Sequence, residues 1–299
     1  MQFGDVVSLT TADGIRIEFD NQVFALRSSG NWGAPPTSFI TRQGYKQHGV
    51  TEVDFQLQTR DLPLQIYRVG ECDRQIYWDN RAELLNFLRP NRGGPLTLTV
   101  QTPDGLSRSI LVRANPGTTF QAAQNDNSFS VDEEVEFLAF SPLWFDEEST
   151  TLTMTAAVQQ NLIFPITFPI SFGTSVVFLS SGLIQYVGSW SEYPILTLTG
   201  PYDSVTIFNE QTDAAIYMNT PLAAGSQRIL DLTPGSQRIT DGSGNNKFSD
   251  LGPNSDLVNF NLRPDPEVAG GQQEITIGFQ GGTSQSAAQM SYRNRYFGI

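Results

Sequence analysis

The chain has 299 residues, of which 39% are hydrophobic, so it can bury a core in each of two domains of ordinary size. Its formal net charge of -13 at pH 7 gives an acidic surface that repels phosphate, which argues against ordinary nucleic-acid binding. No signal peptide is visible and no segment approaches the roughly 20 apolar residues of a membrane span, so we expect no membrane insertion.

The N-terminal segment predicts short strands joined by tight turns. Three alternating apolar runs are separated by Asp-Gly and Asp-Asn dipeptides, at 6–10, 15–19 and 23–26. A proline-containing loop, NWGAPPTSF (31–39), follows them. Residues 50–60 then alternate Val53, Phe55 and Leu57 with acidic and amide side chains, which predicts a strand with one buried and one solvated face.

One helix is expected, in the segment WDNRAELLNFLRP (78–90). Asp79 or Asn80 can cap its N-terminus, and Pro90 ends it. Its apolar stripe consists of Leu84, Leu85, Phe87 and Leu88. These positions recur at the spacing of an amphipathic helix.

Strand signals resume after the helix and lead to a domain boundary. Runs at 96–100 and 109–113 flank a TPDG turn at 102–105. A long strand at 129–140 carries a dense acidic cluster, which comprises Asp132, Glu133, Glu134 and Glu136. The aromatic and acidic stretch FSPLWFDEES (140–149) is typical of the end of one domain and a linker to the next.

Residues 150–280 contain only strand and turn signals, which predicts an antiparallel β-sandwich. The segment 193–213 has two Thr-, Ile- and Val-rich runs around a Gly200-Pro201 corner and contains no histidine or cysteine. We interpret it as part of a scaffold core. The expected fold class is therefore mainly β, with an N-terminal sandwich-type domain that includes one helix and a C-terminal antiparallel sandwich.

Candidate chemistry is sparse. His48 and Cys72 are the only histidine and cysteine, so a disulfide, a common Cys/His zinc site and most nucleophilic arrangements are excluded. We expect no catalytic, cofactor or metal site and no enzyme activity. Two alternatives stay open: a glycoside hydrolase with paired acids, and a two-domain carbohydrate-binding protein that stacks sugars on aromatic rings. The candidate aromatic residues are Trp190, Tyr193, Tyr202 and Tyr217.

Several segments in a fixed order carry a family resemblance. They are RQIYWDNRAELLNFLRPNRGGPLTLTV (74–100), EFLAFSPLWFDEE (136–148), YPILTLTGPYDSVTIFNEQTDAAIYMN (193–219), AAGSQRILDLTPGSQRIT (223–240) and SYRNRYFGI (291–299). The third contains an I-x-N-x-x-T pattern at Ile207, Asn209 and Thr212. In this order the segments resemble the distal tail proteins of bacteriophages with long, non-contractile tails, over most of the chain.

The resemblance implies a structural protein of the virion. An N-terminal domain, residues 1–147, would form a homo-hexameric ring, and a galectin-like β-sandwich, residues 148–287, would decorate its outside. The ring would join the tail tube protein to the tail hub or tip protein and let DNA pass. Tape measure and receptor-binding proteins are further implied partners. The implied place is the tail tip, after assembly in the host cytoplasm, with no cofactor.

Two sets of residues are predicted to serve such a ring. The C-terminal strap, residues 288–299, is expected to return to the N-terminal domain. Its candidate packing residues are Tyr292, Arg293, Arg295, Tyr296 and Phe297. The acidic cluster at 132–136 is hypothesised to line the lumen and repel passing DNA, although alternating acids on a strand can equally form an outer solvated face.

Overall fold

The computed structural model describes residues 6–19, 24–67, 74–91, 93–115, 132–156 and 177–299. The chain divides into two compact units. The first unit comprises Met1–Glu147 and Tyr296–Ile299, and the second comprises Glu148–Arg295. Each unit has its own cluster of buried hydrophobic residues.

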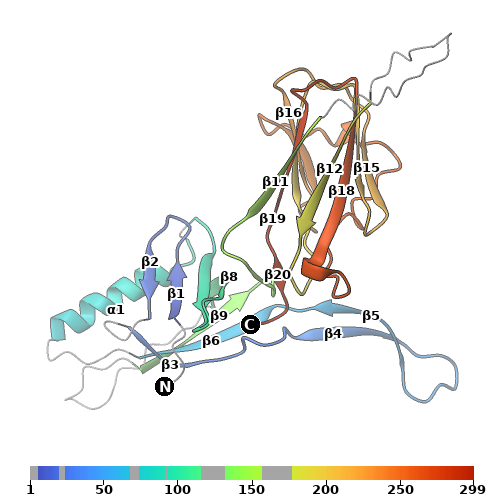
Figure 1. Cartoon of the computed structure of the whole chain (residues 1–299). Helices are drawn as coiled ribbons and strands as arrows, with labels where there is room; N and C mark the ends of the chain where they lie inside the picture. Colours follow the sequence, from blue (N-terminus) through green and yellow to red (C-terminus); the bar gives the residue numbers. More distant parts are fainter. Residues whose placement is uncertain (1–5, 20–23, 68–73, 92, 116–131, 157–176) are drawn as a thin grey trace, which may run out of the picture. The chain divides into compact units, whose positions relative to one another are not determined.

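An antiparallel sheet forms the frame of the first unit, in the order β2-β1-β7-β8-β9-β6-β3 (Figure 1). Its strands are β1 (Val6–Thr10), β2 (Arg16–Glu18), β3 (Ala25–Ser29), β6 (Arg60–Tyr67), β7 (Leu96–Gln101), β8 (Ser107–Ala114) and β9 (Asp132–Ala139). Alternate residues of these strands point into the core, so Leu98, Val135 and Phe137 are fully buried. The short strand β10 (Trp144–Phe145) pairs with β8 and with β20 (Arg295–Tyr296).

Tight turns join neighbouring strands of this sheet where the sequence predicts them. Gly14 lies in the β1–β2 turn and Gly105 in the β7–β8 turn, with φ angles of 85° and 87°. Such left-handed backbone conformations are accessible to glycine without a steric cost. The Asp13-Gly14 and Asp104-Gly105 turns therefore set the registers of the β1–β2 and β7–β8 hairpins.

Helix α1 (Arg74–Leu88) begins earlier than the sequence predicts. Asp79 and Asn80 lie inside the helix, so the predicted N-cap is wrong. The Asp79 carboxylate instead accepts a hydrogen bond of 2.9 Å from the Gln75 amide one turn earlier. Leu84 is buried in the core, but Leu85 of the predicted stripe is 46% exposed. No described helix is long and apolar enough to cross a membrane.

Residues 37–57 form a hairpin that the sequence only half predicts. Its strands are β4 (Thr37–Arg42), which begins within the loop expected at 31–39, and β5 (Thr51–Leu57). The prediction of one buried face for β5 is wrong: Val53 and Phe55 are 62% and 44% exposed, and their polar neighbours are exposed too. Residues 51–56 are all exposed, so neither face of β5 is buried, and among the described strands β5 pairs only with β4.

The second unit consists of two antiparallel sheets, in the orders β11-β19-β13-β16-β17 and β12-β18-β14-β15. Their strands are β11 (Thr150–Thr155), β12 (Val177–Gln185), β13 (Ile195–Thr199), β14 (Ser204–Asn209), β15 (Ala214–Met218), β16 (Gln227–Asp231), β17 (Arg238–Asp241), β18 (Gln272–Gln280) and β19 (Ala287–Tyr292). Two short 3₁₀ helices, η1 (Phe248–Asp250) and η2 (Ala269–Gly271), complete it. Leu196 and Leu198 of one sheet and Ile277 of the other are fully buried in one core. The mainly β fold class with an antiparallel sandwich is confirmed.

The I-x-N-x-x-T pattern marks the turn between β14 and β15. Asn209 is fully buried, and its side-chain oxygen accepts hydrogen bonds from the backbone N–H groups of Gln211 and Thr212, at 3.0 and 3.3 Å. Its amide donates to the carbonyl oxygen of Asn261 at 2.9 Å. The Asn209 side chain thus stabilises the turn through these hydrogen bonds, which also satisfy its polar groups despite burial.

Candidate assembly surface

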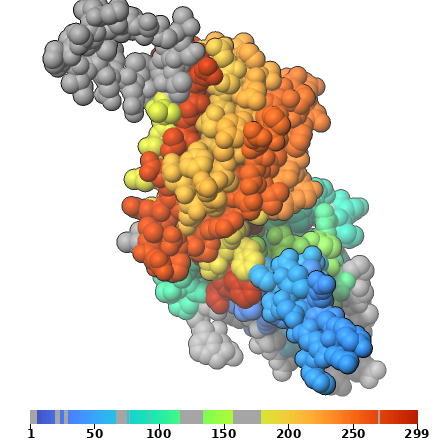
Figure 2. Space-filling model, turned by 90° about the vertical axis from the view of Figure 1, so that its right-hand side faces the viewer, coloured from blue at the N-terminus to red at the C-terminus, as the bar shows by residue number. Residues whose placement is uncertain are grey.

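The β4–β5 hairpin presents large apolar side chains to solvent. Phe39 is 58% exposed, and Ile40 and Val50 are exposed as well. Phe39 and Phe55 occupy directly paired positions on the two strands, so their side chains lie on the same face. Figure 2 shows the blue atoms of this hairpin as a protrusion of the first unit.

The hairpin also has open edges. Among the described strands, β4 and β5 pair only with each other, so the outer edge of each offers free backbone groups. A lone two-stranded hairpin is marginally stable in water, and exposed edges with apolar side chains readily pair with another chain. An apolar surface of this kind marks a contact site. The sequence does not predict this surface, because β4 begins within the loop expected after two prolines. Consecutive Phe39 and Ile40 nevertheless place apolar groups on both faces of β4.

The free end of the hairpin, residues 42–50, is basic. Arg42 and Lys46 are its two cations, and it contains no acidic residue. Tyr45 is 93% exposed, and the Lys46 ammonium lies 5.4 Å from the centre of its ring. His48, the single histidine, is exposed in the same loop.

The last four residues of the chain belong to the first unit, where Tyr296 is buried in the core. Its hydroxyl donates a hydrogen bond of 3.2 Å to the Asp146 carboxylate. The Arg108 guanidinium lies 3.4 Å from the centre of the Tyr296 ring and 2.5 Å from the same carboxylate. Burial raises the pKa of Tyr296 to about 12, so its hydroxyl remains a hydrogen-bond donor at neutral pH.

The buried Arg60 binds the backbone of Phe297, the residue that follows Tyr296. Arg60 is fully buried, and its Nη2 donates to the carbonyl oxygen of Phe297 at 2.8 Å. Its guanidinium lies 5.9 Å from the centre of the Trp144 ring. The Nε and Nη1 groups have no hydrogen-bond partner in the described part of the chain, and burial lowers the pKa of Arg60 to about 10. The backbone N–H of Ile299 then donates to the carbonyl oxygen of Trp32 at 3.0 Å.

The C-terminal segment of the first unit is shorter than the predicted strap of 288–299. Residues up to Tyr292 form β19, which pairs with β11 and β13 of the second unit. The alternation of Ala288, Met290 and Tyr292 explains this placement, because it buries one face of β19 in the second core. Of the five candidate strap residues, only Tyr296 and Phe297 belong to the first unit.

The two remaining arginines of the strap lie in the second unit. Arg293 is half-buried there. Arg295 forms an ion pair in which its Nε lies 2.6 Å from Glu192 Oε2. Burial raises the pKa of Glu192, and the charge of Arg295 offsets part of that increase. This pair holds the chain just before it enters the first unit.

The acidic candidates lie on β9, between β8 and β6. Glu134 and Glu136 are exposed, on the face opposite to buried Val135. Glu136 accepts a hydrogen bond of 2.8 Å from the Asn115 amide. Asp132 and Glu133 belong to the same strand, but their side chains are outside the described part of the structure. The structure thus places two of the four acids on one solvated face.

The other sequence candidates do not come together. The residues described here include no group of three or more His, Cys, Asp and Glu side chains that could hold a metal ion. Cys72 is outside the described residues. Tyr202 is only 2% exposed, so it fills the second core and cannot stack on a sugar. Trp190, Tyr193 and Tyr217 are half-buried.

The chain has the fold of phage hub and baseplate proteins. No family model and no curated protein sequence matches it. Among solved structures, the SPP1 Dit (gp 19.1) protein, described as a paradigm of the hub adsorption apparatus in Gram-positive infecting phages, matches with a TM-score of 0.63 and 14% identity, over 97% of this chain and 99% of that one. Two structures of the phage P2 baseplate in its activated conformation, with Ca and with Sr, each match with a TM-score of 0.55 and 12% identity, over 99% of both chains.

Proposed function

We propose that this chain is a structural distal tail protein of a bacteriophage. Its role would be to form a hexameric ring that connects the tail tube to the tail tip or baseplate and lets DNA pass. The observation that carries the proposal is the match with SPP1 Dit over 97% of this chain and 99% of that one. Both units of the chain are included in that match, so the likeness extends beyond one common sandwich.

The proposed ring would explain why the β4–β5 hairpin exposes apolar side chains. A closed ring of identical chains requires a head-to-tail contact, in which one patch of each chain meets a different patch of the next. The open edges and apolar side chains of β4 and β5 provide one such patch. We propose that neighbouring chains cover it in the assembled tail, together with tube and hub proteins at the two faces of the ring.

We further propose that the solvated face of β9 lines the lumen. Glu134 and Glu136 would repel the phosphates of passing DNA and keep the genome from adhering. In the phage, replacing both residues with lysine should leave tail assembly intact and slow DNA release. A matched pair of lysines at exposed Glu147 and Glu148 serves as the control. Ejection kinetics that stay at the wild-type rate in both variants would contradict the lumen assignment.

Light scattering after size exclusion, followed by negative-stain imaging of the main peak, tests the ring. The expected species has six chains and a central hole. A second preparation, made with the tail tube protein, tests whether a neighbour promotes closure. A chain that neither forms a ring nor binds the tube protein would contradict the proposed function.

A further inference from the structure

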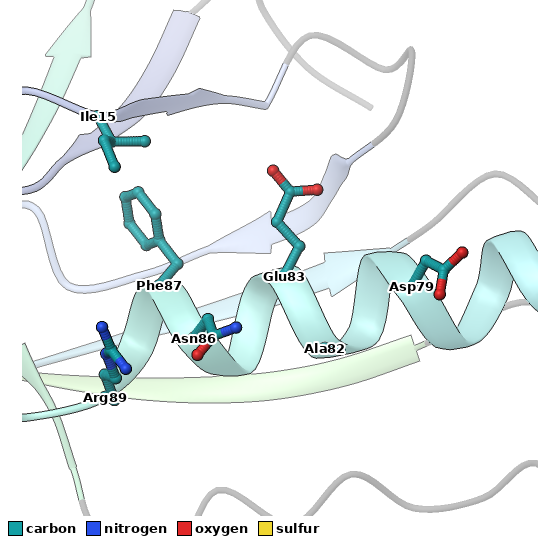
Figure 3. A pocket seen from close by; sticks show the side chains of 7 residues that line it. All are labelled: Ile15, Asp79, Ala82, Glu83, Asn86, Phe87 and Arg89. Atoms are coloured by element: carbon teal, nitrogen blue, oxygen red, sulfur yellow. The ribbon is translucent and has the colours of Figure 1, made fainter.

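A pocket of about 590 Å³ lies along the outer side of α1 (Figure 3). It is lined by Ile15, Asp79, Ala82, Glu83, Asn86, Phe87 and Arg89. In Figure 3 the Ile15 and Phe87 side chains face each other, while the Glu83 and Asp79 carboxylates stand further along the helix. Its volume falls within the range of roughly 300–1,000 Å³ that is usual for ligand pockets. Phe87 is only 3% exposed and belongs to the core, so exposed Ile15 supplies the apolar surface of the pocket, beside two carboxylates and the Arg89 guanidinium.

The free carboxylate of this pocket is Glu83. Asp79 accepts a hydrogen bond from Gln75 within α1, whereas Glu83 has no ion-pair partner in the described part of the chain. An exposed acid beside an exposed apolar side chain suits a partner that offers a cation next to an aromatic ring.

The end of the β4–β5 hairpin has that chemistry. Tyr45 and Lys46 are neighbours, Tyr45 is almost fully exposed, and the nine residues of the loop carry two positive charges in a chain with a net charge of -13. Lys46 has no carboxylate partner among the described residues. Figure 1 shows the hairpin end and α1 at opposite ends of the first unit, so the hairpin of one chain does not reach its own pocket.

We propose that Tyr45 and Lys46 of one chain dock in the α1 pocket of a second copy of this chain. Tyr45 packs against exposed Ile15, and Lys46 pairs with Glu83. The contact joins two different patches, so it repeats from chain to chain in one direction and can close a ring. This inference rests on the proposed ring and names the two surfaces that meet in it.

Cross-linking tests the contact independently of ring stability. In a Cys72→Ser background, chains with His48→Cys, at an exposed position of the same loop, are mixed with chains carrying Ala82→Cys and treated with a short thiol-specific linker. Ala82 lines the pocket, and Leu106→Cys, at an exposed turn, is the matched control partner. The expected product is a covalent dimer with Ala82→Cys, and its yield should drop to background with Leu106→Cys. Equal yields with the two partners would overturn the proposal.

A charge exchange tests the pairing of Lys46 with Glu83. Lys46→Glu and Glu83→Lys should each abolish the selective cross-link and any ring, and the double variant should restore both, since it exchanges the two charges. Circular dichroism of each variant controls for folding. Rings that survive both single variants would overturn this contact while leaving the proposed function standing. A wild-type chain that cross-links selectively but forms no ring would support the contact and count against the ring.

Discussion

At the scale of single residues, the buried guanidinium of Arg60 holds the end of the chain in place. One of its nitrogen atoms binds the Phe297 carbonyl oxygen, while Nε and Nη1 have no hydrogen-bond partner in the described residues. Burial of a charge that is only partly satisfied destabilises the folded state. The lowered pKa of Arg60 reports the same cost.

This balance predicts different outcomes for two substitutions of Arg60. Arg60→Met fills the same space without a charge, so its free energy of unfolding should lie within about 1 kcal/mol of the wild-type value. Arg60→Ala leaves a cavity and should be less stable than Arg60→Met by about 2 kcal/mol or more. Urea denaturation measures both. If Arg60→Met is as unstable as Arg60→Ala, the charge itself is required.

The buried pair of Glu192 and Arg295 predicts a dependence on pH. The pKa of Glu192 is raised in the folded state, mainly by burial, so the unfolded chain loses this proton at lower pH than the folded chain. Stability contributed by protonated Glu192 is therefore present below its ordinary pKa of about 4.3 and falls as pH rises through the folded value. Relative to Glu192→Gln, the wild-type protein should lose stability over this window. Parallel pH curves for the two proteins would contradict the assignment.

At the scale of elements, turn residues and the alternation of apolar with polar residues predict most of the strands. The β1–β2 and β7–β8 hairpins follow from their glycines, and the strands of the sandwich follow from their period of two. β6 contains Pro63 and still lies between β9 and β3, although proline is unusual in an internal strand. The exposure of β5 could not be predicted either, since alternation shows that a strand has two faces but not that something covers one of them.

Most of the candidate site depends on such long-range information. The aromatic side chains of Tyr296 and Phe297 predict packing, whereas their partners Arg60 and Arg108 come from distant strands. The sequence predicts Tyr292 in the strap, but the structure places it in β19, because nothing local distinguishes the last strand of a sandwich from the first residues of a strap.

The four-residue segment Tyr296–Ile299 is predicted to stabilise the first unit. Its deletion exposes the core positions that Tyr296 covers. Arg60 then loses the Phe297 carbonyl oxygen, and Arg108 loses the Tyr296 ring. The loss of the Tyr296 side chain should cost on the order of 1.5–3 kcal/mol. Thermal unfolding of a chain that ends at Arg295 should show a lower Tm for the first unit. Deletion of Gly298 and Ile299 alone keeps Tyr296 and serves as the milder control, and an unchanged Tm in both would contradict the prediction.

At the scale of the whole molecule, three features bear on assembly. They are the exposed apolar hairpin, its open strand edges and the negative net charge of the chain. The net charge of -13 opposes unspecific association, so we expect the proposed ring contacts to use specific patches. The fold that this chain shares with phage hub and baseplate proteins extends over nearly its entire length. We propose that these features serve a closed ring of six chains.

Cryo-electron microscopy of the purified full-length chain at high concentration tests this claim most directly. We expect closed particles with sixfold symmetry, a central channel, and the β4–β5 hairpin of each chain covered by its neighbour. A chain with Phe39→Ser and Phe55→Ser should fold and remain monomeric under the same conditions. Twofold dimers, or wild-type particles in which the hairpins stay exposed, would contradict the proposed ring.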